Sequence, residues 1–430
     1  MEGLALYRYW FVFVYGCYLY FNKGIAYTYL TEITWAVGIL LFLRHFKSLK
    51  IAWGKVLGVL LFLLLVNFIQ MLRGAAAFSL LDVVRDSFIF NYGCFIFIVF
   101  LFWNERHQLL AQITELYRYF PIILATTYLI RTLFPDIMQW ELVGDIPFLL
   151  YKNGDMAVHL LIAVMLILTG KLTWENPRVA IFNYILLFYL FLIAATYNRG
   201  GTLAFLVTLS FFVYRSRRTE WFDKIKTYFK YIPLVIALAL PLYLSTKIKV
   251  EDKEYGRQIG LSQLRDNIVS IVAKDAAKSN AGLEGNVTWR LLWWGNIIDY
   301  TFAGPYFWQG KGLGVNLSVD DDIKVEGEEL RSPHNFSMTI LARYGVPIFF
   351  VWLLFLFFVF QPLLKKKLPA NQLLLGCALA AIFINASFDV SLEGPMMAFP
   401  FWSLMGIYLM EQAEDASNSQ AENPQAESIS

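Results

Sequence analysis

The feature that most constrains this chain is a series of apolar runs, each near the ~20 residues that a helix needs to cross a lipid bilayer. Of its 430 residues, 58% are hydrophobic and 16% charged, whereas a soluble chain carries about 25% charged residues. The sequence therefore predicts an all-α polytopic membrane protein with about twelve transmembrane helices. The predicted spans are residues 6–22, 25–43, 55–72, 87–103, 118–135, 156–171, 179–197, 200–215, 230–246, 336–361, 371–387 and 394–411.

Lysine and arginine gather in alternate connections between these spans, and such loops face the cytoplasm. With twelve spans, all the basic loops fall on one face, and both termini lie on the cytoplasmic side. The basic residues are Arg44, Lys47, Lys50 and Lys55; Arg106 and Arg118; Lys171 and Arg178; Arg215, Arg217, Arg218, Lys224, Lys226 and Lys230; and Lys365, Lys366 and Lys367. The N-terminal apolar run lacks a small-residue cleavage site, so we expect it to be the first span and not a signal peptide.

This topology divides the chain into four parts. Nine spans in 1–246 precede one large loop on the outer face at 247–333, and three spans follow at 334–411. The loop is expected to be partly helical, because residues 260–278 place Leu, Ile and Val at helical spacing. The last part, 412–430, is polar and without large apolar residues, which predicts a disordered cytoplasmic tail.

His334 is one of only four histidines and stands where the large loop meets a span, in "RSPHNFSMTILARYGVPIFF". Ser332 suits a helix N-cap and Pro333 the first helical position, so His334 is expected in the first turn. The positive helix end would keep its imidazole neutral and able to accept a proton. The alternative is an interfacial histidine that only caps the loop.

Arginines on the outer side are candidates for phosphate binding, because the guanidinium fork binds phosphate through two hydrogen bonds. Arg199 lies in "YNRGG" at a hairpin tip, where two glycines permit close approach. Arg290 lies among aromatic residues in "NVTWRLLWWGN". The alternatives are contact with lipid headgroups for Arg199 and a loop ion pair or stacking on tryptophan for Arg290. Arg73 is a weaker candidate of the same kind.

Acidic residues offer fewer candidates. Asp320, Asp321 and Asp322 could hold a divalent cation, but such a run is more often a solvated loop. Asp389, in "ASFDVSLEGP", could orient a substrate or an arginine, or could cap a turn. The other histidines lack metal-ligand spacing and the three cysteines fall in apolar runs, so no metal site is expected. No nucleotide-binding glycine loop is present, and we expect no cofactor and no nucleic-acid partner.

The chain resembles the O-antigen ligase and polymerase superfamily of bacterial inner-membrane glycosyltransferases in three segments. "NRGG" resembles its Arg-Gly at the outer start of a helix. "WRLLWWGNIIDYTFAGPYFWQGKGLGVNL" resembles its Arg, Trp and Gly-x-Gly, although aromatic residues replace the usual short approach to the glycines. "PHNFSMTILARYGVPIFF" resembles its His-Asn, Leu and Gly.

The resemblance implies a GT-C-like architecture and a site on the periplasmic face. It implies that Arg199 and Arg290 hold the diphosphate of an undecaprenyl-linked glycan while His334 activates the acceptor hydroxyl, in an inverting and metal-independent transfer. Asp389, Asn335 and Arg73 would have supporting roles. Two such charges and one neutral base suffice, because the lipid diphosphate is already an activated leaving group.

The leading hypothesis is a ligase in the bacterial inner membrane that transfers O-antigen en bloc to lipid A-core. The alternative is an O-antigen or exopolysaccharide polymerase, whose acceptor is a second lipid-linked glycan. One dominant late loop favours the ligase, because many polymerases have two. A transporter would show paired repeats, and none is found. A metal-dependent glycosyltransferase would place acidic ligands in its first outer loop, "FNKG", which has none.

Overall fold

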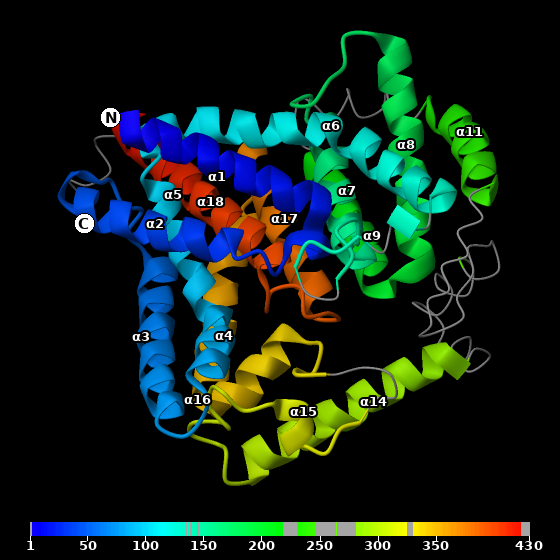
Figure 1. Ribbon diagram of the computed structural model, residues 1–430. Helices are drawn as coiled ribbons and strands as arrows, with labels where there is room; N and C mark the ends of the chain where they lie inside the picture. The colour runs from blue at the N-terminus through cyan, green and yellow to red at the C-terminus, as the bar shows by residue number, and fades with distance from the viewer. Residues whose placement is uncertain are drawn as a thin grey trace.

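The computed structural model describes residues 2–134, 136–137, 140–143, 146–217, 230–245, 264, 281–324 and 330–422. The regular secondary structure of these residues is helical, with no strand beyond an isolated bridge between Glu141 and Pro147. The helices (Figure 1) are α1 (Glu2–Phe21), α2 (Leu30–His45), α3 (Lys55–Ala75), α4 (Leu80–Asn91), α5 (Phe95–Phe100), α6 (Arg106–Leu133), α7 (Asn153–Leu168), α8 (Pro177–Tyr197), α9 (Arg199–Ser216), α11 (Ile232–Ser245), α14 (Ala281–Ile298), α15 (Leu317–Asp320), α16 (Phe336–Phe360), α17 (Ala370–Ala386) and α18 (Pro395–Glu422).

The all-α class is confirmed in this part of the chain, and each of the twelve predicted spans overlaps a helix. Four helices of the described residues are long and apolar enough to cross a membrane: Lys55–Ala75, Leu80–Phe100, Pro177–Tyr197 and Phe336–Leu364. Three more, α7, α11 and α17, are apolar but shorter. These features fit an integral membrane protein, while the count of twelve crossings and the side of each terminus stay predictions.

Several boundaries differ from the predicted ones. The fourth span was expected from residue 87, but its helix begins at Leu80 and passes through a 3-10 turn at Tyr92–Cys94 into α5. The fifth was expected from 118, but α6 begins at Arg106, because its first turns are amphipathic and not apolar. α18 continues to Glu422, so residues 412–422 are helical where we expected a disordered tail.

Part of the large loop expected at 247–333 is helical, since α14 and α15 lie within it. The helix expected over 260–278 lies outside the described residues, apart from Leu264. The basic residues Arg218, Lys224 and Lys226 lie outside them too.

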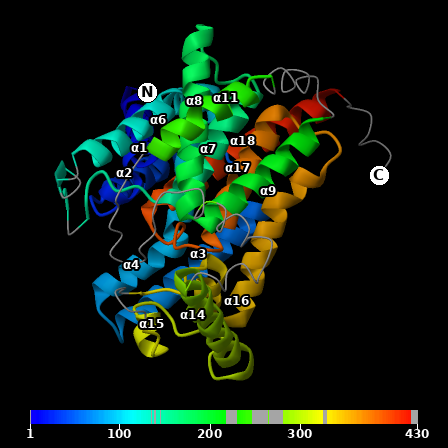
Figure 2. The same ribbon diagram turned by 90° about the vertical axis from the view of Figure 1, so that its right-hand side faces the viewer.

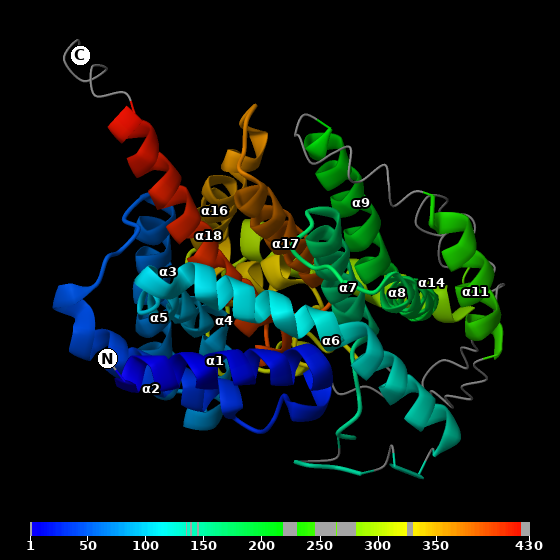
Figure 3. The same cartoon turned by 90° about the horizontal axis from the view of Figure 1, so that it is seen from above.

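Aromatic side chains join the N-terminal and C-terminal helices. The ring of Phe399 in α18 packs against Phe11 and Tyr15 of α1 and against Phe95 of α5, with centroids 4.7 to 6.0 Å apart. α6 lies alongside α1 (Figure 3). A second group forms where α7, α9 and α17 pack against one another and α8 packs against α11. Aromatic pairs at such distances add to the stability gained from burial alone.

The contacts between connections divide them into two sets at opposite ends of the helices. One set, which we call the α14 end, comprises residues 22–29, 146–152, 304–324, 330–335 and 387–394. α14 and α15 lie there, and α16 runs from it toward the other end (Figure 2). The other set is joined by the pairs Arg8–Glu105, Arg106–Glu414, Arg118–Thr173 and Arg215–Lys365. The twelve-span topology requires this division, because it places the same two sets on opposite faces.

α16 is broken at Gly345, whose φ of 80° and ψ of −179° are not helical. The break frees backbone groups, and the glycine-rich segment 307–312 binds them. Lys311 N donates to Ala342 O at 2.8 Å, and Val346 N donates to Phe307 O at 2.8 Å. The segment therefore pairs with the helix as a strand would, which satisfies groups that would be costly to leave unpaired in a buried site.

We expect Gly345→Ala to destabilise the protein strongly. A Cβ at Gly345 would lie 2.5 Å from Phe307 O, and its backbone angles suit only glycine. The steric clash and the backbone strain together should lower the free energy of unfolding by more than the about 1–3 kcal/mol that backbone strain alone costs. Thermal unfolding of the purified chain in nanodiscs would measure it. Gly58→Ala is the matched control, because nothing lies within 4 Å of that Cβ position in α3. An equal melting temperature for the two variants would contradict the role of Gly345.

Candidate functional site

The turn between α17 and α18, residues 387–394, is the point where the predicted site residues meet. It binds the start of α7, the middle of α14 and the start of α16, which are far apart in sequence. The contacts are Lys152 Nζ to Asp389 Oδ1 at 2.6 Å, Arg290 Nη1 to Phe388 O at 3.1 Å and Thr339 Oγ1 to Glu393 Oε1 at 2.7 Å. The 387–394 turn thus fixes a cation, a guanidinium and a helix start around one place.

His334 is not in the first turn of a helix. α16 begins at Phe336, and its N-cap is Asn335, whose Oδ1 accepts from Met338 N at 3.1 Å. The predicted cap at Ser332 was wrong because Asn335 takes that position and the residue before it turns back. His334 has a φ of 52°, a conformation that non-glycine residues seldom adopt. His334 therefore precedes the cap of α16, and Asn335 has a structural role as that cap.

The imidazole of His334 lies against α14. Trp289 meets it edge to face, with ring centroids 5.4 Å apart. Nη2 of Arg290 lies 3.4 Å from Nδ1 of His334. Trp294 Nε1 donates to Pro333 O at 2.8 Å and holds the backbone just before the histidine. Two consecutive residues of α14 therefore surround the imidazole: Trp289 packs its ring against it, and Arg290 places a positive charge beside it.

Burial lowers the pKa of His334 to about 4. Asp389 acts to raise it, whereas Arg290, Lys152 and Lys23 act to lower it further. The sequence predicted a neutral imidazole from a helix dipole. The imidazole is neutral near pH 7, but the cause is desolvation together with nearby cations.

Asp389 and Lys152 form an ion pair whose side chains are 14% and 15% exposed. Burial alone would raise the pKa of Asp389, but Lys152 and His334 outweigh it and hold that pKa below its usual value. Burial alone would lower the pKa of Lys152, and Asp389 and Asp155 outweigh it in the upward direction. Both groups are therefore charged near neutral pH, and a fixed carboxylate lies close to His334.

Arg199 is the first residue of α9, at the same end of the molecule. The preceding Asn198 caps this helix by accepting from Gly201 N at 2.6 Å. A Cβ on Gly200 would lie 2.7 Å from the Cβ of Phe388, the residue whose carbonyl binds Arg290. Phe388 thus touches the α9 start on one side and Arg290 on the other. The two glycines permit this close approach of backbones, as the sequence suggested.

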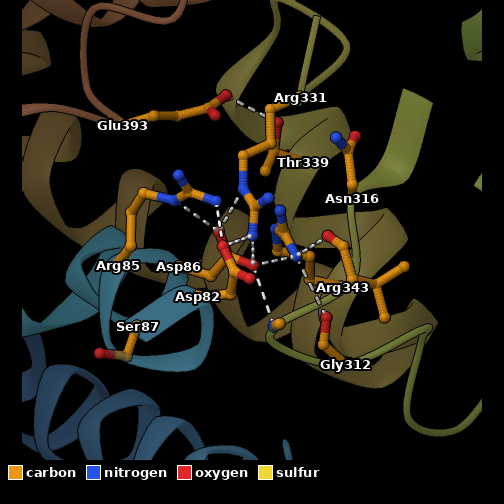
Figure 4. A network of polar contacts seen from close by, with 12 residues as sticks. Asp82, Arg85, Asp86, Ser87, Gly312, Asn316, Arg331, Thr339, Arg343 and Glu393 are labelled. Carbon is orange, nitrogen blue, oxygen red and sulfur yellow. Dashed lines mark hydrogen bonds and ion pairs between the residues drawn. The ribbon is translucent and has the colours of Figure 1, made fainter. Parts of the chain in front are cut away.

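A buried carboxylate in α4 holds the strand-like segments around the site (Figure 4). Asp86 accepts from Arg331 Nε at 3.0 Å and from Gly314 N at 2.9 Å, and it pairs with Arg343 Nη1 at 2.8 Å. Its side chain is 4% exposed and that of Arg343 is 3% exposed. Since a buried charge is tolerated only when paired and hydrogen-bonded, this cluster fixes Gly314, Arg331 and Arg343 against α4.

Two predicted candidates lie elsewhere. Arg73, at the end of α3, is exposed and lines a separate pocket with Lys311 and Asp320. The acidic run is not a uniformly solvated loop. Asp320 and Asp321 pair with Lys311, and Asp321 also accepts from Trp293 Nε1 at 2.6 Å, while Asp322 pairs with Lys324 on the surface.

One group of potential metal ligands occurs in the described part of the chain, and the sequence spacing did not show it. His107, Glu411 and Glu414 place ligand atoms within 4.8 Å of one another. They lie between α6 and α18, at the end opposite His334. Arg106 already pairs with Glu414, so this group forms an ion-pair cluster.

A family model described as O-antigen ligase matches residues 182–353. Over these residues the match supports membership of the O-antigen ligase and polymerase superfamily. The matched region contains Arg199, Arg290 and His334 and ends just after the break in α16. No curated protein matches the sequence.

The sequence did not point to every residue near this place. Asp389 was a predicted supporting residue, but its partner Lys152 was not predicted, because the two lie on connections that meet only in the folded chain. Asp86 had a usable signal, because an ionisable residue inside an apolar helix marks a functional or structural centre by default. Arg331 and Arg343 flank His334, but their common partner lies 245 positions from Arg331.

We expect Asp86→Ala to cost about 3–5 kcal/mol of folding free energy, because it leaves the buried Arg343 without its carboxylate. Asp82→Ala is the matched control on the same helix. Asp82 pairs with the half-exposed Arg85 and with Nη2 of Arg331. Its loss should therefore cost about 0–1 kcal/mol of folding free energy. Unfolding in nanodiscs would measure both. Adding Arg343→Met should recover part of the loss, and a loss equal in the two aspartate variants would refute the paired-charge role.

Proposed function

We propose that this chain is a ligase that transfers a glycan en bloc from undecaprenyl diphosphate to a sugar hydroxyl of lipid A-core. The observation that carries the proposal is one juxtaposition. His334, Arg290 and the 387–394 turn meet at a single end of the helices, and the start of α9 with Arg199 touches that turn. We further propose that this end faces the periplasm of a bacterial inner membrane, where the lipid tail can stay in the bilayer.

In the proposed reaction, the acceptor hydroxyl attacks the anomeric carbon of the donor glycan. The new carbon–oxygen bond forms as the bond to the lipid diphosphate breaks, and the diphosphate leaves with the bonding electrons. Arg199 and Arg290 stabilise its growing negative charge. His334 accepts the hydroxyl proton, and Asp389 stabilises the imidazolium that results. Attack opposite the leaving group inverts the anomeric centre.

The contact with Arg290 bears on which nitrogen acts as the base. A guanidinium only donates, so Nδ1 of His334 accepts from it and the ring proton belongs on Nε2 in this tautomer. Arg290 would leave Nδ1 when it turns to a bound diphosphate. The same anion would raise the histidine pKa from about 4 toward neutrality, where a base is most effective. Donor binding would therefore prepare the base.

The match to a family described as O-antigen ligase supports the donor chemistry, and the single dominant late loop favours transfer to lipid A-core over polymerisation. Both reactions use the same donor chemistry, so the acceptor must be tested directly. Purified chain with a lipid-linked glycan would be offered either lipid A-core or a second lipid-linked glycan. Deletion of the gene should leave the core without O-antigen while long lipid-linked chains remain. A core that bears a single repeat would instead identify a polymerase.

We expect His334→Ala to abolish transfer while the protein still folds, because no other described residue beside Arg290 offers a neutral base. Glycan transfer by purified variants in nanodiscs would measure this. His107→Ala is the control, since His107 is exposed at the opposite end. Near-normal turnover by His334→Ala would leave the histidine only a structural role.

The pH profile adds a second measurement for His334. The base is active when deprotonated, so lowering its pKa to about 4 extends activity toward acid. The kcat/KM value, which reports the free enzyme, should hold from pH 8 to about pH 5 and fall below that. As the pH is lowered, kcat should begin to fall at a higher pH than kcat/KM does, because bound diphosphate raises the histidine pKa. A fall of kcat/KM near pH 6.5 would contradict the buried environment.

We expect Arg290→Lys and Arg199→Lys each to lower kcat by roughly 30- to 1,000-fold, equal to about 2–4 kcal/mol. Lysine keeps the charge but loses the two-pronged contact with phosphate. Single-turnover transfer would measure the loss. Arg178→Lys, on the exposed start of α8, is the control. Wild-type rates in both site variants would mean that these arginines only anchor the α14 end.

A further inference from the structure

A second pocket, of about 350 Å³, lies at the α14 end. Its volume falls in the range of roughly 300–1,000 Å³ that is typical of small-molecule sites. None of its lining residues is His334, Arg290, Arg199 or part of the 387–394 turn. The side chains that line it include Arg73, Phe78, Tyr306, Lys311 and Asp320.

The glycine-rich segment forms one wall of this pocket with bare backbone. Gly312 has a φ of 87°, and a Cβ there would meet only Gln70 Oε1 at 3.6 Å, so the space before it is open. Gly74 of α3 approaches Leu313 so closely that a Cβ would lie 2.7 Å from its carbonyl oxygen. The pocket is thus held by backbone packing between α3 and this segment.

The polar groups of the pocket are fixed to different degrees. Lys311 pairs with Asp320 and Asp321, and its Nζ lies 4.3 Å from the ring centroid of Tyr300 and 5.5 Å from that of Tyr306. Arg73, by contrast, is exposed, and its hydrogen bond within the described residues is a long one of 3.5 Å to Gln70. Its guanidinium is therefore available to a ligand in the pocket.

This combination suits a sugar and not a bare anion. Each sugar hydroxyl both donates and accepts, and the pocket offers donors on Arg73 and Lys311 beside an acceptor on Asp320. The Tyr306 ring offers an apolar face for the C–H groups of a pyranose. The carboxylate of Asp320 would repel an isolated phosphate. We propose that this pocket binds one saccharide unit of the acceptor glycan.

The assignment to the acceptor rests on the proposed function. A chain of contacts connects the pocket with the segment that bears the base. Asp86 accepts from Gly314 N and from Arg331 Nε, and Arg331 precedes His334 by three residues. Gly314 lies between Leu313 and Val315, which line the pocket. The pocket is also separate from Arg290, Arg199 and the 387–394 turn, to which the proposed function assigns the donor diphosphate, so the acceptor is the substrate that it would hold.

The first test is kinetic, on the full chain in nanodiscs with lipid A-core as acceptor. Arg73→Ala and Tyr306→Ala should each raise the acceptor KM about tenfold, while kcat and the donor KM stay unchanged. Lys324→Ala removes a cation from the same segment outside the pocket and should leave all three constants unchanged. A rise in the donor KM, or no rise in the acceptor KM, would overturn the proposal.

A binding measurement separates this proposal from the proposed function. Delipidated core oligosaccharide would be titrated into the His334→Ala protein, with and without Arg73→Ala, and inorganic phosphate would be added as competitor. Binding that is lost in the Arg73 variant and resists phosphate supports the saccharide site, even if the wild-type chain transfers no glycan. Binding that phosphate abolishes, or that Arg73→Ala leaves intact, refutes it.

Discussion

The break in α16 is the constraint on which the α14 end depends. An unbroken helix would satisfy its own carbonyls and leave nothing for residues 307–312 to bind. With Gly345 in a conformation that only glycine adopts, Ala342 and Arg343 present their carbonyl oxygens sideways, and Lys311 and Gly312 donate to them. Gly310 and Gly345 are both needed, since a Cβ on either would lie within 2.5 Å of the other segment's backbone. Gly310 and Gly345, which belong to two of the sequence motifs, thus form a single contact between residues 307–312 and α16.

Around that contact the charges are arranged by burial. Asp86 pairs with Arg343 and Arg331, and Asp82 pairs with Arg331 as well. Asp389 pairs with Lys152. Arg290 binds the Phe388 carbonyl and lies beside Nδ1 of His334, with its guanidinium 5.2 Å from the centroid of the Trp289 ring. These contacts hold a positive charge beside the imidazole.

The sequence predicted the helices well, because a run of apolar residues of membrane length has few alternatives to a helix. It also placed Arg290 and His334 correctly at one end of the molecule. It failed where tertiary contacts decide. The cap moved from Ser332 to Asn335, because Trp294 and Arg290 hold the preceding residues. Arg73 was grouped with the site arginines, since a topology gives only the face of a residue and not its pocket. Lys152 gave no signal, as its partner lies 237 positions away.

Asp86 also has a consequence for how the chain is made. Its carboxylate lies in one of the first helices to leave the ribosome, yet Arg331 is synthesised 245 residues later. At roughly 5–20 residues per second, that interval lasts about 12–50 seconds. During it, Asp86 has its neighbour Arg85 on the same helix but lacks Arg331 and Arg343, in a helix apolar enough to enter the bilayer. The α14 end can therefore assemble only after the C-terminal helices have been synthesised. A truncated or stalled chain would leave Asp86 without Arg331 and Arg343 and its α14 end incomplete.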